Sequence, residues 1–333
     1  MTVRELWAAL EKDAQTAQPG FLFRRIPSAR DLRLAIDQAS GRRMLLLGVS
    51  SADSTSERSE LPVSTGFSLR ALPDTRPGRT VIQLQMGLPA FRDVFTVLVE
   101  DVVSQIVNLS TDRLALDGLL LRLVRWQEFL KAAGPDGLSE TAQRGLFGEL
   151  HFLRHELMPA VGPGSSVQSW AGPLRAPQDF QLPGRSIEVK VSAAKQLQRL
   201  RISSERQLDD VPGGGRLLLM HISVDVRDTG DATLPGLVAE LRAALASDPA
   251  TLSLFEDRLF LAGYLDAHAD RYGRASYAVR ELNFFHVHGA FPRITERMLI
   301  PGTGDVTYAL ALSACMPFRI TEAAAREIIA EHP

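Results

Sequence analysis

Residues 176–192 read APQDFQLPGRSIEVKVS, and this stretch decides the fold that we expect for the chain. The pair Pro183-Gly184 suits a type II turn, because proline presets the first central dihedral angle and glycine accepts the positive φ of the second. A two-residue loop of this kind pairs Leu182 with Arg185. The sequence therefore predicts a hairpin of fixed register.

Two carboxylates face each other in this register. Counting back from the turn makes Asp179 and Glu188 cross-strand neighbours, with Cβ atoms ~5 Å apart. Because side chains alternate along a strand, one face carries polar residues and the other carries apolar residues. The polar face holds Ser186, Glu188, Lys190 and Ser192, and the core face holds Ile187, Val189 and Val191.

A divalent cation would relieve the repulsion between these acids. Mg²⁺ prefers oxygen ligands and is usually held by one or two carboxylates together with waters and phosphate. Lys190 would lie beside the ion, where it could orient or deprotonate an attacking water or stabilise phosphate charge. Of 37 basic residues only four are lysines (Lys12, Lys131, Lys190 and Lys195), so a lysine here departs from the general use of arginine.

This arrangement resembles the PD-(D/E)XK, or restriction-endonuclease-like, nucleases, over roughly Ser139 to Leu245. Their pattern is an acid on one strand and an acid-any-Lys triplet on the next, within a core of helix, three-strand meander, helix and strand. The resemblance implies that Asp179 and Glu188 bind metal and that Lys190 is the catalytic lysine. The chain is also similar to an uncharacterised bacterial family of this type that is found near restriction and phage-defence genes.

Glu149, in RGLFGELHFL, matches a helix glutamate that many of these nucleases add to the metal site. Gly145 and Gly148 would let this helix, which Ser139 can cap, approach the sheet closely. One departure is that Pro177 stands two residues before the aspartate instead of one. The alternative interpretation is a solvated edge strand and an exposed glutamate on the helix.

Local charge supports a phosphate ligand. Between Arg185 and Arg206 there are six basic residues and two acids, in a chain whose net charge is -2. We expect contacts to DNA phosphates from Lys195, Arg199, Arg201, Ser204 and Gln207. The alternatives are that the charges form an ordinary solvated face and that Ser204-x-x-Gln207 is a helix-capping box.

The expected fold is a mixed α/β (α+β) protein of two domains. Residues 1–135 form an N-terminal mixed α/β domain for recognition or partner contacts, and residues 136–333 form a nuclease-like domain with a central mixed sheet flanked by helices. The apolar patterns predict strands near 21–26, 44–49, 66–72, 80–86, 198–203, 216–226, 258–264, 283–288 and 306–312. They predict helices near 91–106, 111–132, 139–157, 234–245 and 321–329, and one from Ser204.

Composition narrows the class of protein further. The 333 residues include 45% hydrophobic and 23% charged side chains, which is typical of a folded protein. The lone cysteine, Cys315, excludes an internal disulfide framework and a cysteine-rich zinc finger. We find no secretory signal or membrane span in the sequence and expect a soluble, cytoplasmic protein.

The sequence therefore predicts a Mg²⁺-dependent endonuclease, with Mn²⁺ as a substitute, that hydrolyses DNA in a restriction or phage-defence system. Its expected partners are DNA, a second copy in a homodimer and other defence proteins. One alternative is a non-catalytic DNA-binding or scaffold subunit on the same fold. Another is a zinc hydrolase built on the spaced histidines His151 and His155 or His286 and His288.

Overall fold

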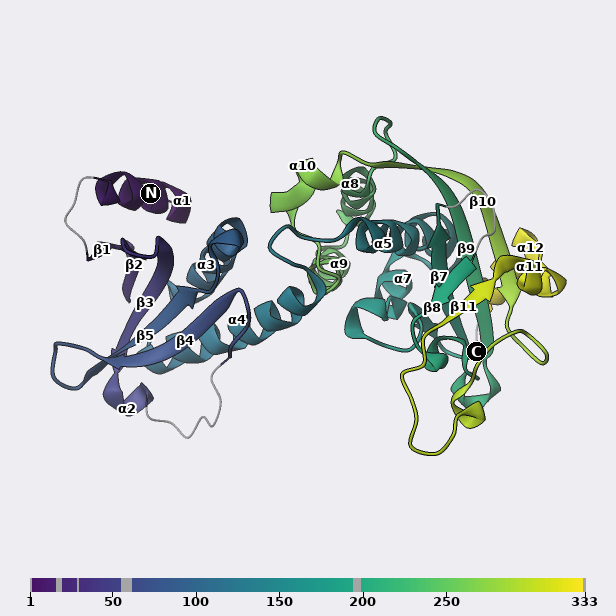
Figure 1. Ribbon diagram of the computed structural model, residues 1–333, viewed down its shortest axis with the longest axis horizontal. Helices are drawn as coiled ribbons and strands as arrows, with labels where there is room; N and C mark the ends of the chain where they lie inside the picture. Colours follow the sequence, from purple (N-terminus) through teal and green to yellow (C-terminus); the bar gives the residue numbers. More distant parts are fainter. Residues whose placement is uncertain (1, 16–19, 29, 55–61, 194–198, 332–333) are drawn as a thin grey trace. The chain divides into compact units, whose positions relative to one another are not determined.

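A computed structural model describes residues 2–15, 20–28, 30–54, 62–193 and 199–331. The chain divides into two compact units, Met1–Gly137 and Leu138–Pro333, which are drawn in Figure 1. Among the helices in the described ranges, none combines the length and the apolar character that crossing a bilayer requires. Each unit is built around its own sheet.

The first unit contains a five-stranded antiparallel sheet in the order β1-β2-β3-β5-β4. The strands are β1 Phe21–Arg25, β2 Asp31–Asp37, β3 Arg42–Ser50, β4 Phe67–Pro73 and β5 Arg79–Met86. The helices are α1 Val3–Ala14, α2 Ser51–Ser54, α3 Arg92–Ile106 and α4 Asp112–Ala132, with a 3-10 turn η1 at Pro89–Phe91. The predicted strands 21–26, 44–49, 66–72 and 80–86 are confirmed, whereas β2 and α1 were not predicted.

Arg43 on β3 marks the face of this sheet on which α1 and α3 pack. Its guanidinium lies 2.6 Å from the Glu11 carboxylate and 5.1 Å from the centre of the Trp7 ring, both on α1. It also donates to the hydroxyl of Thr96 on α3. The alternate residues of the strands face the other way.

The second unit contains a five-stranded mixed sheet in the order β12-β10-β9-β7-β6. Its strands β7 and β9 are parallel and the other pairs are antiparallel. The strands are β6 Phe180–Leu182, β7 Arg185–Ser192, β9 Arg216–Arg227, β10 Ser276–His286 and β12 Arg319–Ile320. A separate two-stranded sheet joins β8 Arg199–Ile202 to β11 Tyr308–Ala311.

Helices flank this mixed sheet, as the sequence predicts. They are α5 Glu140–Phe152, α6 Met158–Val161, α7 Pro163–Ser169, α8 Leu234–Leu245, α9 Pro249–Leu261, α10 Ala269–Tyr272, α11 Leu312–Cys315 and α12 Glu322–Ala330. Ser139 caps α5 by accepting from the backbone of Ala142. Between α5 and α6 lies η2 Leu153–Leu157, a π-helical turn. The remaining 3-10 turns are η3 Gly172–Leu174, η4 Glu205–Leu208, η5 Pro212–Gly214, η6 Asp266–His268, η7 Glu296–Met298 and η8 Met316–Phe318.

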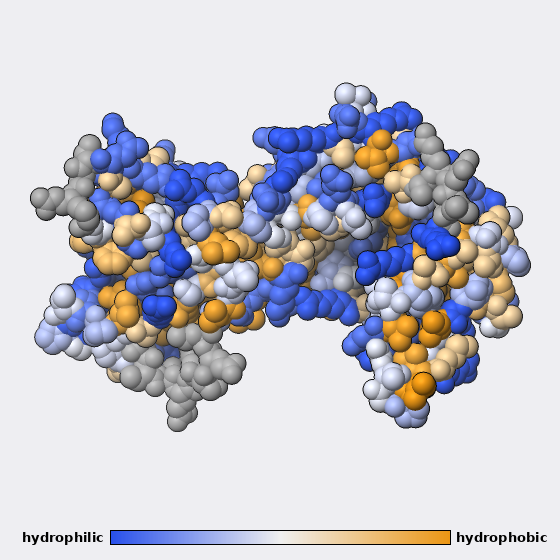
Figure 2. Space-filling view, viewed as in Figure 1, coloured by the Kyte–Doolittle hydropathy of each residue, from blue (hydrophilic) through white to orange (hydrophobic). Residues whose placement is uncertain are grey.

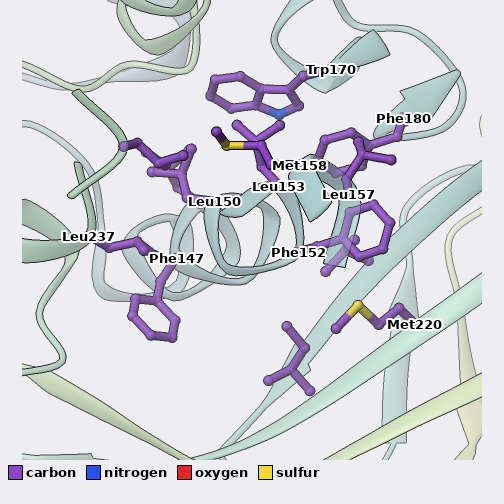
Figure 3. Packing of buried hydrophobic residues seen from close by; sticks show 14 of the residues in the cluster. Phe147, Leu150, Phe152, Leu153, Leu157, Met158, Trp170, Phe180, Met220 and Leu237 are labelled. Carbon is purple, nitrogen blue, oxygen red and sulfur yellow. The ribbon is translucent and has the colours of Figure 1, made fainter. Parts of the chain in front are cut away.

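Two apolar clusters hold the second unit together. Figure 3 shows the larger one around the helical segment 140–161, where Trp170, Phe180 and Met220 are fully buried. The smaller cluster lies between the sheet and the β8–β11 pair and includes Leu219, Ile202 and Phe285. The polar face of β7 is therefore covered by other parts of the second unit and is not open to solvent along its length.

Three details of the sequence prediction were wrong. Residues 258–264, expected as a strand, contain the end of α9, because Thr251, Phe255 and Leu259 repeat at helical spacing on its buried side. The helix expected from Ser204 is only the 3-10 turn η4. The third strand of the expected meander, β8, pairs with β11 instead of joining β6 and β7.

Gly148 lets α5 approach β7, and a matched pair of substitutions tests this contact. A Cβ at Gly148 would lie 2.2 Å from Cγ2 of Val191, whereas a Cβ at Gly145 meets nothing within 4 Å. We expect Gly145→Ala to raise the free energy of unfolding by about 0.5–1 kcal/mol through helix propensity. Gly148→Ala should lower the free energy of unfolding by about 1–2 kcal/mol, because the cost of overpacking against Val191 exceeds the gain in helix propensity. Urea denaturation measures both, and an increase in both variants would contradict the close packing.

Candidate active site

The hairpin forms in the predicted register. Phe180 pairs with Ile187 and Leu182 pairs with Arg185, and Gly184 has the positive φ of 73° that the turn requires. Asp179 immediately precedes β6. Its Oδ2 accepts a hydrogen bond of 2.8 Å from the backbone N–H of Val189, so its carboxylate reaches across to β7.

Glu188 is the most deeply buried residue of the site. Its side chain has no solvent exposure, and Nζ of Lys190 lies 2.6 Å from its Oε1. The ammonium of Lys190 is the one cationic partner of this carboxylate among the described residues. A buried carboxylate near a second acid is costly, so Glu188 has capacity to bind a further cation.

Lys190 is held from two sides. Besides its ion pair with Glu188, its Nζ donates to Oε1 of Gln207 at 3.1 Å. The same oxygen accepts the backbone N–H of Ser203 at 2.8 Å. Gln207, which follows the capping residue Ser204, therefore fixes the end of the lysine side chain.

Glu149 reaches the same place from α5. Its Oε2 accepts a hydrogen bond of 2.8 Å from Nε1 of Trp170, whose side chain is fully buried. A Cβ at Gly172 would lie 3.1 Å from this oxygen and 3.1 Å from Oδ1 of Asp179. The carboxylates of Glu149 and Asp179 thus both lie next to Gly172, and a side chain at position 172 would be in tight contact with both.

The site holds three acids and one ammonium group, and the pKa values of all three acids are raised. Burial, aided by the charge of Asp179, raises the pKa of Glu188 to about 8. Burial also raises the pKa values of Glu149 and Asp179, the former with the charge of Asp179 added and the latter opposed by Lys190. Burial alone would lower the pKa of Lys190, but the charges of Glu188 and Asp179 outweigh it and raise that pKa. We expect Lys190 to stay protonated at neutral pH.

These residues fit a hard divalent cation. The carboxylate of Glu188 and the two acids around Gly172 are ligands of the type that Mg²⁺ prefers. As the side chains stand, no three His, Cys, Asp or Glu of the described ranges are arranged to hold one ion together. Because Mg²⁺ usually keeps several waters and takes only one or two protein carboxylates, a smaller ligand set still suits it.

The residues predicted to contact DNA phosphates have different surroundings in the structure. Arg199 and Arg201 are exposed on β8, while the alternate residues of that strand are buried. Ser204 caps η4 by accepting from the backbone of Arg206, but the capping box with Gln207 does not form, because the Gln207 side chain accepts from Ser203 and Lys190. The prediction for Lys195 lies outside the described residues.

Each of the two histidine pairs brings its rings close together. The rings of His151 and His155 are 4.5 Å apart beside a cavity of about 300 Å³ that Thr233 and Tyr277 also line. The rings of His286 and His288 are also 4.5 Å apart. Neither pair belongs to a group of three metal-ligating side chains within the part of the chain that the structure describes.

Two residues of the site carry no signal in the sequence. Trp170 and Gly172 lie in SWAGPL, which matches no catalytic pattern, and they act only through their contacts with Glu149 and Asp179. A sequence pattern names residues that do chemistry more readily than residues that hold them in position.

No curated protein and no solved structure matches the chain. A family model covers residues 3–313, and its description reads "Putative PD-(D/E)XK family member, (DUF4420)". Because this match spans nearly the whole chain, the protein belongs to the DUF4420 family of the PD-(D/E)XK type.

Proposed function

We propose that this protein is a divalent-metal-dependent deoxyribonuclease whose centre is Asp179, Glu188 and Lys190, with Glu149 beside them. The observation that carries the proposal is the fully buried Glu188, whose carboxylate lies near the acid Asp179 and has the ammonium of Lys190 as its cationic partner. Membership of a PD-(D/E)XK family supports a nuclease of this type.

Each residue has a distinct role in this proposal. Asp179 and Glu188 would hold Mg²⁺, for which Mn²⁺ can substitute, with Glu149 as a further acid beside them. A bound ion would supply Lewis-acid chemistry and lower the pKa of a water. Lys190, whose pKa is raised, acts as a fixed ammonium that binds phosphate oxygen or orients the water, and is not a general base.

DNA would be held by groups that surround the acids. Arg199 and Arg201 are exposed and make no ion pair within the described ranges. The amide nitrogen of Gln207 is left to donate to a phosphate oxygen, because its carbonyl oxygen binds Lys190. Lys195 and Ser204 complete the proposed phosphate contacts. The first unit would serve recognition or partner binding in a restriction or phage-defence system, and cutting both strands would use a homodimer.

A metal titration with supercoiled plasmid tests the function. We expect nicking or linearisation that needs Mg²⁺ or Mn²⁺, stops with EDTA and is lost in Asp179→Asn. The alternative is a non-catalytic DNA-binding subunit, in which Lys190 neutralises Glu188 without a metal ion. Such a protein would bind DNA but would not cleave it at any metal concentration, and this result would contradict the proposed nuclease activity.

Trp170 provides a test of the proposed metal site that does not depend on cleavage. Trp170→Phe keeps a ring in the core but removes the N–H that Glu149 accepts. Loss of a residue that orients a metal ligand typically weakens metal binding by about 10–100-fold, and we expect ~10-fold weaker Mn²⁺ binding by calorimetry. Trp126→Phe is the matched control, since Nε1 of Trp126 donates to Asp101 at 2.8 Å in the first unit. Equal Mn²⁺ affinity of the two variants would argue against Glu149 as a ligand.

A further inference from the structure

The sheet of the first unit has a face opposite to Arg43. The registers place Phe23 beside Ala35 and Met44 beside Gln85 on this face. The contacts that position α1 and α3 through Arg43 all lie on the other face. The strand residues that share the Phe23 face include Phe21, Phe23, Arg25, Asp31, Arg33, Ala35, Asp37, Arg42, Met44, Leu46, Ser68, Arg70, Leu72, Arg79, Val81, Gln83 and Gln85.

Two phenylalanines stand in solvent at the edge of this face. Phe21 is 68% exposed and Phe23 is 63% exposed, although Ala35 and Met44 next to them are buried. The two residues are two positions apart on the edge strand β1, so their rings project on the same side roughly 7 Å apart. Isolated exposed apolar residues are common, but a pair of exposed aromatic rings on one face indicates a binding surface.

The same face carries a positive surplus. Arginines 25, 33, 42, 70 and 79 oppose only Asp31 and Asp37 among its strand residues. Arg33 is paired with Asp31, and Arg79 with Asp112. Arg25 and Arg70 are exposed and make no ion pair or hydrogen bond within the described ranges. These two guanidinium groups are therefore available to an anionic ligand.

Amide groups occupy the middle of the face. Nε2 of Gln83 donates to Oε1 of Gln85 at 3.2 Å, and both side chains are half-buried. Each amide keeps further donors and acceptors for a polar ligand. Figure 2 shows hydrophobic and hydrophilic side chains interspersed over the surface of the first unit, which suits a ligand that has both apolar and charged parts.

We propose that this face of the first unit binds single-stranded nucleic acid. Two successive unstacked bases would lie on the rings of Phe21 and Phe23, and the backbone phosphates would contact Arg25 and Arg70. The amides of Gln83 and Gln85 would meet base edges. A duplex cannot offer base faces to the two rings, because its bases are stacked on one another. A protein partner would need acidic side chains opposite these arginines, whereas a nucleic acid carries a phosphate at every nucleotide.

Fluorescence anisotropy of the full-length protein tests this proposal in EDTA, where metal-dependent cleavage cannot occur. The probes are labelled 20-nucleotide dT and U strands and a 20-base-pair duplex. We expect tighter binding to a single strand than to the duplex, and the dT and U probes separate DNA from RNA as the ligand. Phe21→Ala/Phe23→Ala should weaken single-strand binding by ~10-fold or more, since stacking contributes strongly for each base.

Two further variants sharpen the result. Arg25→Ala/Arg70→Ala should lower the slope of log affinity against log salt by about 1.4, or ~0.7 for each lost phosphate contact. Leu121→Ala removes a residue that is 70% exposed on α4 and should bind as the native protein does. Because all these side chains are exposed, thermal melting should show the variants folded.

The proposal fails if Phe21→Ala/Phe23→Ala binds single strands like the native protein. It also fails if the native protein binds neither single strand. Anisotropy in EDTA reads binding alone and does not require cleavage. The binding result and the nuclease result therefore stand or fall independently.

Discussion

Lys190→Ala is expected to lower metal-dependent plasmid cleavage by about 10²–10³-fold in kcat, the usual effect of removing one fixed group that stabilises developing charge. Nζ of Lys190 lies beside Glu188 and is held by Gln207, so it is aimed before substrate arrives. Single-turnover cleavage at saturating Mg²⁺ measures the change. The KM for plasmid should change little, because exposed arginines supply most of the attraction to phosphate.

Lys190→Arg distinguishes the two roles open to the lysine. Arginine keeps a positive charge but cannot give up a proton at neutral pH. Since the pKa of Lys190 is raised, we expect a charge role and hence at least ~10-fold more activity in Lys190→Arg than in Lys190→Ala. Equal loss in both variants would indicate a general base, and full activity in Lys190→Ala would remove the lysine from the mechanism.

Glu188→Gln is expected to unfold at a higher temperature than the native protein at pH 9 in metal-free buffer, and at nearly the same temperature at pH 5. The pKa of Glu188 is about 8 in the folded protein, against 4.5 as its ordinary value. A group whose pKa is raised on folding stabilises the protein fully below the unfolded pKa, and that stability is lost as pH rises through the folded pKa. The native protein should therefore weaken between about pH 4.5 and 8.

The size of this effect follows from the pKa change. Each unit corresponds to about 1.4 kcal/mol, so ionising Glu188 costs on the order of 5 kcal/mol at high pH, which the glutamine avoids. Adding Mg²⁺ at pH 9 should restore the native protein and not the variant, because the ion binds the ionised carboxylate. Glu140→Gln, at an exposed position on α5, controls for loss of charge. Parallel melting curves for native protein and Glu188→Gln from pH 5 to 9 would contradict the assignment.

Much of the candidate site could be predicted from local sequence. Pro183-Gly184 determines the hairpin register, and that register brings Asp179 and Glu188 together without any knowledge of the remaining fold. The long helices were also predictable, since their apolar residues repeat at helical spacing and Ser139 caps α5. In these cases, residues close in sequence decide the structure.

Long-range contacts explain what could not be predicted. The partner of β8 is β11, more than 100 residues further along the chain, and no local pattern specifies that pairing. The link between Trp170 and Glu149 likewise depends on how the loop after α7 folds back. Residues 258–264 contain the end of α9 because Leu259 continues the buried side of the preceding turns, which Thr251 and Phe255 begin.

The hydrogen bond from Trp170 to Glu149 also gives the molecule an optical probe. The chain has three tryptophans, and the other two, Trp7 and Trp126, belong to the first unit. Once those two are replaced by phenylalanine, the emitted light comes from a single indole whose N–H contacts a carboxylate of the site. The wavelength and intensity of its fluorescence emission should then report on the charge of the Glu149 carboxylate, in real time and without an added label.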